Sequence, residues 1–341
     1  MQHLTFPEET FMKRRSALKL LAGSLSAPVV LHATTAKAHT TSNPKDNDEF
    51  RQALDGFTQI NPGQSSVSLT VHDPDSTYRF DHLGTKPLFV GSAIKTYILG
   101  QYLLDVETGK LDEDERLQVG PAVWSPGGDV LVDVQGTIPA RNVLEMMIAH
   151  SDNTSTDMAI KQVGPARVRE LIKKLGLQHT QIPDSTRVLF SYLNGAPSGK
   201  DEGWEGMQAM EKGESFGPIR DPINPDQTMM STAEEMRAWY DYVLSGKLFK
   251  NESTLKEFKR ISAMANAIPS LMPDGIMGYG KGGSIIWNDF NCFTIAGQMV
   301  IPGTRTVNFC FITNWSGAES TITPTFAQFV KYSSEMIHSL A

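Results

Sequence analysis

The feature that most constrains the fold is the placement of strand-like patterns at both ends of the chain, with helical patterns between them. Residues 66–71 alternate apolar and polar side chains, and residues 284–313 hold further strand-like segments around a Pro-Gly turn. Between the two, residues 92–264 place apolar side chains three or four positions apart, as helices do. A sheet built from both ends and interrupted by a helical insertion accommodates all of these segments.

We therefore predict an α/β fold in which an antiparallel sheet is flanked by helices and carries a large all-helical insertion domain. Residues 48–85 and 265–341 form the sheet domain in this prediction, after a polar linker at 39–47, and residues 86–264 form the helical domain. Within it, residues 194–226 are rich in glycine, proline and charge, with little periodicity. So long a connection is uncommon in a compact domain. We expect a flap that borders the functional site, or a mobile insertion.

The first 38 residues have the pattern of an export signal. Arg14 and Arg15 form a twin-arginine pair, an apolar run covers residues 20–31, and residues 36–38 read Ala-Lys-Ala, a small-x-small cleavage pattern. The apolar run is too short to span a membrane. We predict a signal peptide at 1–38, export by the twin-arginine route, and a periplasmic or secreted protein without a stable membrane anchor.

The composition excludes several classes of protein. With 40 % apolar and 20 % charged residues the chain is an ordinary globular protein, and its net charge of −7 argues against nucleic acid as a partner. The eight histidines show no metal-ligand spacing, so we expect no metal. We also expect no cofactor and a monomer. Cys292 and Cys310 flank a turn that does not place them opposite each other, so buried thiols are favoured over a disulfide.

Three short motifs carry the chemistry. Ser92 and Lys95 are one helical turn apart, so the lysine can take the serine proton if its pKa is lowered. Residues 151–153 read Ser-Asp-Asn, and Lys281 precedes two glycines at the start of an apolar strand, where a ligand can approach the backbone closely. Taken singly, each motif has an ordinary structural explanation: a capping serine with a solvated lysine, a helix N-cap, or a glycine turn.

The three motifs in this order indicate a function far more specifically than any one of them alone. S-x-x-K, S-D-N and a K-[TS]-G-like triplet are the signature of class A β-lactamases and penicillin-binding proteins, and the chain resembles that family over residues 48–341. Phe89-Val90-Gly91 before the first motif and Met147-Ile148-Ala149-His150 before the second agree with it. Trp124-Ser125-Pro126 is similar to the aromatic-Ser-Pro segment that walls one side of the family's site. The family's fold is the interrupted sheet described above.

The resemblance implies a role for each catalytic residue. Ser92 attacks a lactam or peptide carbonyl, with Lys95 as its general base. Ser151 passes the proton to the leaving nitrogen, while Lys281 holds that hydroxyl and attracts a substrate carboxylate. The backbone N–H groups of Ser92 and Ser284 form the oxyanion hole.

The resemblance also implies a substrate-binding set, in which the Asn153 amide holds a substrate carbonyl. The residues of this set are Asn153, Gly283, Ser284 and Trp124. One departure from the family concerns the third motif, where Gly282 stands in place of a hydroxyl-bearing residue and removes one carboxylate contact. Ser284, two positions on and on the same face of the strand, is a partial replacement.

A second departure concerns hydrolysis of the acyl-enzyme. Class A β-lactamases carry a glutamate, in the loop after the segment that matches residues 175–177, that activates the deacylating water. Residues 182–194 contain no glutamate, and Asp184 is acidic but misplaced. Four glutamates lie in the insertion, at positions 202, 205, 211 and 214.

We predict an exported serine hydrolase that forms an acyl-enzyme on a β-lactam or a related amide or ester, with a small-molecule or peptide acyl substrate. Three alternatives stay open: a D-alanyl peptidase of the penicillin-binding type, an esterase or amidase for another acyl group, and a non-turnover β-lactam binder. Residues 275–281 nearly spell a phosphate loop, but Gly282 replaces the required Ser/Thr and a strand follows. His150 is expected to be a packed helix-end residue.

Overall fold

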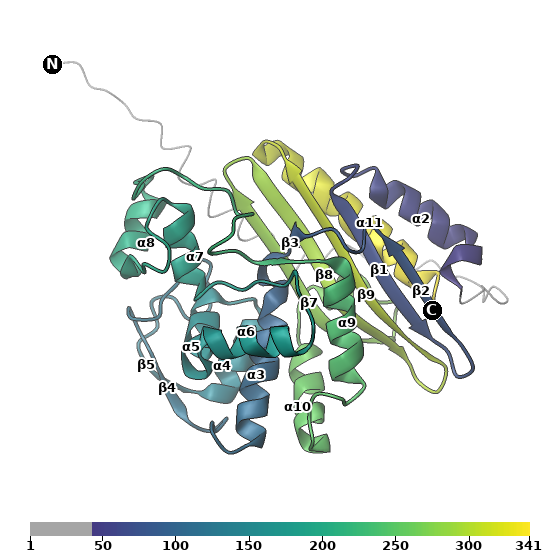
Figure 1. Ribbon diagram of the computed structural model, residues 1–341, viewed down its shortest axis with the longest axis horizontal. Helices are drawn as coiled ribbons and strands as arrows, with labels where there is room; N and C mark the ends of the chain where they lie inside the picture. The colour runs from purple at the N-terminus through teal and green to yellow at the C-terminus, as the bar shows by residue number, and fades with distance from the viewer. Residues whose placement is uncertain (1–42) are drawn as a thin grey trace.

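The computed structural model describes residues 43–341, and its centre is a five-stranded antiparallel sheet in the order β2-β1-β9-β8-β7 (Figure 1). Strand β1 pairs with β9, so the two ends of the chain meet inside one sheet. This arrangement is the one expected from the strand patterns. The strands are β1 (Ser65–His72), β2 (Thr77–His82), β7 (Met277–Trp287), β8 (Phe290–Ile301) and β9 (Arg305–Ser316).

The predicted signal peptide and residues 39–42 of the predicted linker lie outside the described residues. The rest of the linker contains a short 3-10 turn, η1 (Pro44–Asp46), and Asn47 caps the helix that follows by accepting a hydrogen bond from the Phe50 N–H at 3.0 Å. In the part of the chain that the structure covers, no helix is long and apolar enough to cross a membrane.

Helices from the two ends of the chain cover one face of the sheet. α2 (Asp48–Thr58) and α11 (Ile322–His338) pack side by side, as Figure 1 shows. The ring of Phe57 lies 5.8 Å from that of Phe311 on β9 and 5.7 Å from that of Phe329 on α11. All three rings are buried, so the helices are held on the sheet by a continuous apolar contact.

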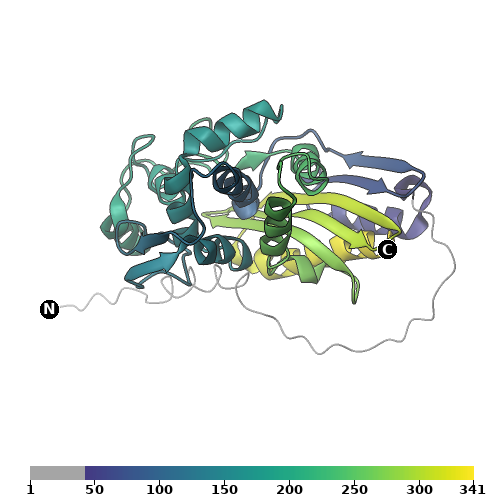
Figure 2. The same ribbon diagram turned by 90° about the horizontal axis from the view of Figure 1, so that it is seen from below.

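The helical region lies against one end of the sheet (Figure 2). It also contains two short strand pairs, β3 (Leu88–Phe89) with β6 (Met230–Ser231) and β4 (Arg116–Val119) with β5 (Gly136–Pro139). The helices of this region are α3 (Lys95–Glu107), α4 (Ala140–Ala149), α5 (Asn153–Val163), α6 (Pro165–Lys174), α7 (Thr186–Leu193), α8 (Gly203–Glu211) and α10 (Glu252–Ser262).

One helix joins the two regions. α9 (Ala233–Leu244) lies within the range predicted as helical domain, but it packs on β1, β8 and β9 of the sheet. Its Trp239 ring lies 4.8 Å from that of Tyr97 on α3, and the Trp239 indole N–H donates to the Thr96 hydroxyl at 2.8 Å. Sequence periodicity predicts the helix but not its partner, because an apolar stripe fits a sheet as well as another helix.

The insertion at residues 194–226 is mostly exposed but anchored. α8 buries Met207 and Met210, and the Trp204 ring makes an edge contact with Trp124, 5.7 Å between centroids. At its other end, the Arg220 carbonyl accepts a hydrogen bond from the Trp287 indole of β7 at 3.0 Å. The segment is therefore a small folded unit tied to the helical region and to the sheet.

The register of β8 and β9 decides the state of the two cysteines. Cys292 lies opposite Asn314, and Cys310 lies opposite Ala296. Both thiols are free and buried. The prediction of buried thiols rather than a disulfide is confirmed.

Candidate active site

A cavity lies where the helical region meets β7. Its walls come from the 3-10 turn η2 (Gly91–Ile94), the junction of α4 and α5, the first turns of α7, and β7. Six of the predicted site residues line it: Ser92, Ser151, Asn153, Lys281, Gly283 and Ser284. Elements distant in sequence thus bring the three motifs to one place.

Close backbone contact between β7 and η2 shapes one wall of the cavity. A Cβ atom built on Gly283 would lie 2.1 Å from the Val90 carbonyl oxygen and 2.9 Å from the Ser92 nitrogen. Gly91 has φ +53°, and a Cβ atom built on it would also clash, at 2.8 Å from the Ser284 nitrogen. Only glycine permits this approach. It brings the backbone nitrogens of Ser92 and Ser284 to the same wall, as an oxyanion hole requires.

The Ser151 hydroxyl lies between two buried lysines. Lys281 Nζ donates to Ser151 Oγ at 2.9 Å and to the Gly282 carbonyl at 2.8 Å. Lys95 Nζ lies 3.3 Å from Ser151 Oγ and donates to the Ser151 carbonyl at 2.5 Å and to Asn153 Oδ1 at 2.7 Å. Ser151 has φ +58°, a left-handed conformation that is strained for a residue with a side chain.

The residues of the S-D-N triplet have different roles: Asp152 stabilises a helix, and Ser151 and Asn153 face the cavity. Asp152 caps α5 by accepting from the Ser155 N–H at 2.6 Å, and it also accepts from the Val130 N–H at 2.9 Å. The structural explanation of the motif as an N-cap is therefore correct for Asp152. Its neighbours Ser151 and Asn153 are left facing the cavity and Lys95.

Burial controls the charge of both lysines. Burial lowers the pKa of Lys95 to about 7, against the Asp152 and Asp157 carboxylates, which raise it. Burial also lowers the pKa of Lys281 well below its ordinary value, and the charge of Lys95 lowers it further. Two like charges around one hydroxyl are unfavourable, so a neutral amine is available near neutral pH.

Trp124 does not wall the cavity, contrary to the expectation from the sequence. Its side chain is buried, its indole N–H donates to the Val134 carbonyl at 2.9 Å, and its ring contacts Trp204 of the insertion. The presence of an aromatic residue before Ser-Pro does not fix the direction of its ring. Here the contact with α8 turns it away from the cavity.

The absence of a side chain at Gly282 is explained by its neighbour Ala267. A Cβ atom on Gly282 would lie 2.6 Å from the Cβ of Ala267, which also lines the cavity. Ala267 thus occupies the space that a hydroxyl-bearing side chain would need. A small residue at each of these two positions is therefore needed for the other.

Several residues that line the cavity are not among those predicted from the sequence. His150 is exposed and lines the cavity, rather than packing at the helix end as expected. Its position directly before Ser151 was the available signal. Thr186, Leu189 and Phe190 form one face of α7 toward the cavity, and their spacing of three and four residues could have been read as a helical stripe.

The acidic residues near the site are placed differently from one another. Asp184 is tied to Arg169 at 2.7 Å and to the Gln227 amide at 2.8 Å, and it does not line the cavity. Asp129 lines the cavity and is exposed. Within residues 194–226 the structure places no side chain in the cavity lining, so the insertion does not border the site as expected.

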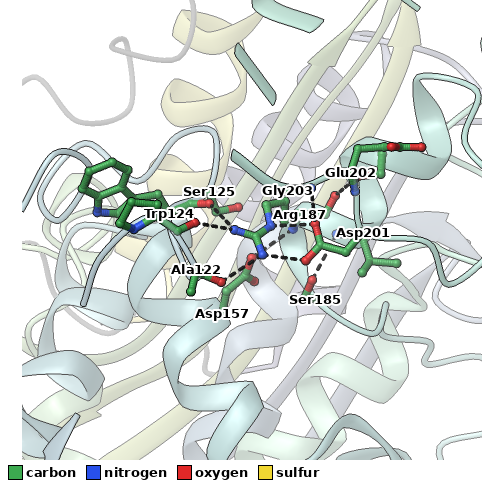
Figure 3. A network of polar contacts seen from close by, with 12 residues as sticks. Ala122, Trp124, Ser125, Asp157, Ser185, Arg187, Asp201, Glu202 and Gly203 are labelled. Carbon is green, nitrogen blue, oxygen red and sulfur yellow. Dashed lines mark hydrogen bonds and ion pairs between the residues drawn. The ribbon is translucent and has the colours of Figure 1, made fainter. Parts of the chain in front are cut away.

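Arg187 ties α7 to its surroundings (Figure 3). Its guanidinium donates to the Ala122 carbonyl at 2.9 Å, the Trp124 carbonyl at 3.0 Å and both oxygens of Asp201, at 2.7 and 2.6 Å. The side chain is buried, and Asp201 belongs to the insertion. The insertion therefore helps to hold the cavity wall that α7 provides.

No cluster of three or more His, Cys, Asp or Glu side chains within residues 43–341 could hold a metal ion. The buried lysines and the hydroxyls of the cavity are groups for proton transfer and anion binding rather than for cation ligation.

A model of the "Beta-lactamase enzyme family" matches residues 49–298 of the chain. Among curated proteins the chain is similar to the extended-spectrum beta-lactamase PER-1 of Pseudomonas aeruginosa, with 27 % identity over 97 residues. That segment is 27 % of this chain and 32 % of PER-1, so the match spans about a third of the length of that relative.

Solved structures share the fold at low identity. PBP-A has a TM-score of 0.63 at 16 % identity, over 84 % of this chain and 96 % of that one. A beta lactamase from Xanthomonas campestris has a TM-score of 0.63 at 14 % identity, over 88 % and 100 %. The class A beta-lactamase of the last common ancestor of Gram-negative bacteria has a TM-score of 0.64 at 14 % identity, over 85 % and 98 %. The predicted fold class is confirmed.

The Gly282–Ala267 contact makes a prediction about stability. Gly282→Ser alone is expected to lower the free energy of unfolding, because the new Cβ meets Ala267. Ala267→Gly in the same chain should relieve the clash, giving a favourable coupling of about 1–3 kcal/mol in a double-mutant cycle. Urea unfolding of the four proteins measures it. Additive effects of the two substitutions would show that the contact imposes no constraint.

Proposed function

The chain belongs to the beta-lactamase enzyme family, and on that premise we propose that it is an exported serine hydrolase that forms an acyl-enzyme at Ser92. Its substrate in this proposal is a β-lactam or a related amide or ester. The observation that carries the proposal is the Ser151 hydroxyl held between the amines of Lys95 and Lys281, in the same cavity as Ser92.

Acylation begins with loss of the Ser92 proton. Neutral Lys95 lies one turn along the chain and is the base for this proton, as its lowered pKa allows. Ser92 Oγ attacks the carbonyl carbon, and the oxygen that gains charge lies against the backbone N–H groups of Ser92 and Ser284. These groups are fixed by the glycine contacts between η2 and β7, so they need no reorganisation during the reaction.

Collapse of this intermediate needs a proton on the leaving nitrogen. Ser151 Oγ is the donor, and it is replenished by the amines on either side of it. Lys281, together with the Ser284 hydroxyl, also attracts a substrate carboxylate, since Gly282 offers no hydroxyl. Asn153, held by its contacts with Lys95 and the Pro126 carbonyl (2.6 Å), presents its amide to the substrate.

The cavity favours an acyl group with an apolar part. Phe190 of α7, Met229 before β6 and Ile286 of β7 all line it. A substrate that joins an apolar acyl group to a carboxylate would use both this surface and Lys281.

A second function is favoured by the α7 wall. That wall is lined by Thr186, Leu189 and Phe190, none of which is acidic. Without a carboxylate in direct contact with the deacylating water, hydrolysis of the acyl-enzyme would be slow, and the acyl group would pass more readily to another nucleophile. A D-alanyl peptidase of the penicillin-binding type is the second candidate. An esterase or amidase and a non-turnover β-lactam binder remain as further alternatives.

The sequence supports a proposal for the location and partners of the protein. The twin-arginine pattern of residues 1–38 supports export to the periplasm or the medium, where β-lactams and cell-wall peptides are encountered. We propose that the protein acts as a monomer on small-molecule or peptide acyl substrates, without cofactor.

The nucleophile is tested by intact mass after incubation with a penicillin. The protein should gain the mass of one penicillin, and Ser92→Ala should not, because it lacks the attacking oxygen. Ser155→Ala is a matched control on the neighbouring helix and should keep the adduct. An adduct that persists in Ser92→Ala would overturn the assignment.

The lowered pKa of Lys95 predicts how acylation depends on pH. The rate of adduct formation should rise through about pH 7 and level off above it, because only the neutral amine accepts a proton. Stopped-flow measurement with a chromogenic cephalosporin follows this rate. Lys95→Arg, which stays charged, should react slowly at every pH. A flat profile for the unaltered protein would contradict Lys95 as the base.

Turnover of penicillin should show a stoichiometric burst followed by a slow steady state. General base catalysis contributes about 10²–10⁴-fold, and the α7 wall supplies no carboxylate directly to the cavity. Rapid-quench measurement of released product gives both phases. Fast turnover without a burst would show that an efficient base is present, and the β-lactamase function would then be favoured over the peptidase.

A further inference from the structure

We propose that Thr186 and Asp157 form a proton relay that activates the water for hydrolysis of the acyl-enzyme. The inference rests on the proposed function, since it needs an acyl group on Ser92. Thr186 is the first residue of α7 and lines the cavity with Ser92, while Asp157 lies behind it on α5.

The contacts between these two residues are specific. The Thr186 hydroxyl donates to Asp157 Oδ1, and the Thr186 N–H donates to the same oxygen at 2.7 Å. The second oxygen of Asp157 accepts from the Arg187 N–H at 3.0 Å. Ser125 Oγ donates to the Thr186 hydroxyl at 3.3 Å. The carboxylate therefore accepts a hydrogen bond from the hydroxyl of Thr186, a residue of the cavity wall.

The surroundings of Asp157 suit a proton acceptor. Its side chain is buried, and the hydrogen bonds above come from neutral donors. Burial raises the pKa of Asp157 above its ordinary value, against the hydrogen bonds from Thr186, Arg187 and Ser125. A carboxylate made more basic in this way accepts a proton more readily than an exposed carboxylate does.

The relay is held in place from outside the cavity. The Arg187 side chain bonds to the Ala122 and Trp124 carbonyls and to Asp201, as Figure 3 shows. These contacts fix the first turn of α7, where Thr186 lies. A relay of two side chains needs such rigidity, since each transfer needs hydrogen-bond distances.

A water molecule attacks the acyl carbonyl carbon on Ser92 and gives a proton to Thr186 Oγ1, while the Thr186 hydroxyl proton moves to Asp157 Oδ1. A new C–O bond forms, and the carbonyl π electrons move onto the oxygen in the oxyanion hole. When the intermediate collapses, the carbonyl re-forms and the ester bond to Ser92 breaks. Asp157 gives its proton back to the Thr186 hydroxyl, which passes one to Ser92 Oγ. The acid is released.

Two other carboxylates compete for this role. Asp129 lines the cavity directly but is exposed, whereas Asp157 is buried. Asp184 is tied to Arg169 and lies outside the lining. Of these three carboxylates, Asp157 is the one that is buried and bonded to a hydroxyl of the cavity wall.

The test separates acylation from deacylation. The acyl-enzyme is formed with a penicillin, excess drug is removed, and decay of the adduct is followed by intact mass. Thr186→Val, which keeps the shape but not the hydroxyl, should lengthen the half-life of the adduct at least about tenfold with the acylation rate nearly unchanged. Thr186→Ser should restore the decay. Asp157→Asn should also slow decay, and the double variant should be no slower than either single one.

The controls make each outcome decisive. Asp129→Asn should leave the decay unchanged, and Ser125→Ala should have a small effect, because it removes a donor and not the relay. Thermal unfolding identifies any variant that does not fold, in which case Thr186→Ala replaces Thr186→Val. Unchanged decay in the variants without the hydroxyl, equal slowing of both steps, or dependence on Asp129 would overturn the relay. Absence of any adduct on the unaltered protein would instead overturn the proposed function itself.

Discussion

The hydroxyl of Ser151 shared by the buried amines of Lys95 and Lys281 is the interaction on which the rest of the site depends. Removing two amines from water costs several kcal/mol for each one that stays charged, so the fold must supply hydrogen bonds in return. It does so with the Ser151 and Gly282 carbonyls and with Asn153. The same burial that is costly for stability lowers the pKa values of the lysines, which makes a neutral amine available as the proposed base.

The second constraint is the contact of two backbones. β7 and η2 approach so closely that a side chain on Gly283 or Gly91 would overlap the opposite main chain. This contact fixes the position of Ser92 relative to the strand that carries Lys281. β7 is the edge strand of the sheet in which β1 and β9, from opposite ends of the chain, pair with each other, and η2 packs against β7 and β8. The two glycines therefore allow the fold to place Ser92 beside the strand that carries Lys281.

The sequence predicts what depends on local pattern. The interrupted sheet follows from strand patterns at both ends, and the three motifs follow from residue types at short spacings, so Ser92, Ser151 and Lys281 meet as expected. It does not predict what depends on distant packing. Trp124 turns toward α8, and α9 packs on the sheet, because each finds its partner in three dimensions. The contact between Ala267 and position 282 cannot be predicted from the sequence for the same reason.

The central claim is that Ser92 receives the acyl group while the backbone nitrogens of Ser92 and Ser284 hold the carbonyl oxygen. A crystal structure of the protein after brief exposure to a penicillin tests it most directly. We predict continuous density from Ser92 Oγ to the opened lactam, with the carbonyl oxygen at about 2.7–3.1 Å from both nitrogens. An acyl group on another side chain, or an intact lactam bound without a covalent bond, would contradict the account.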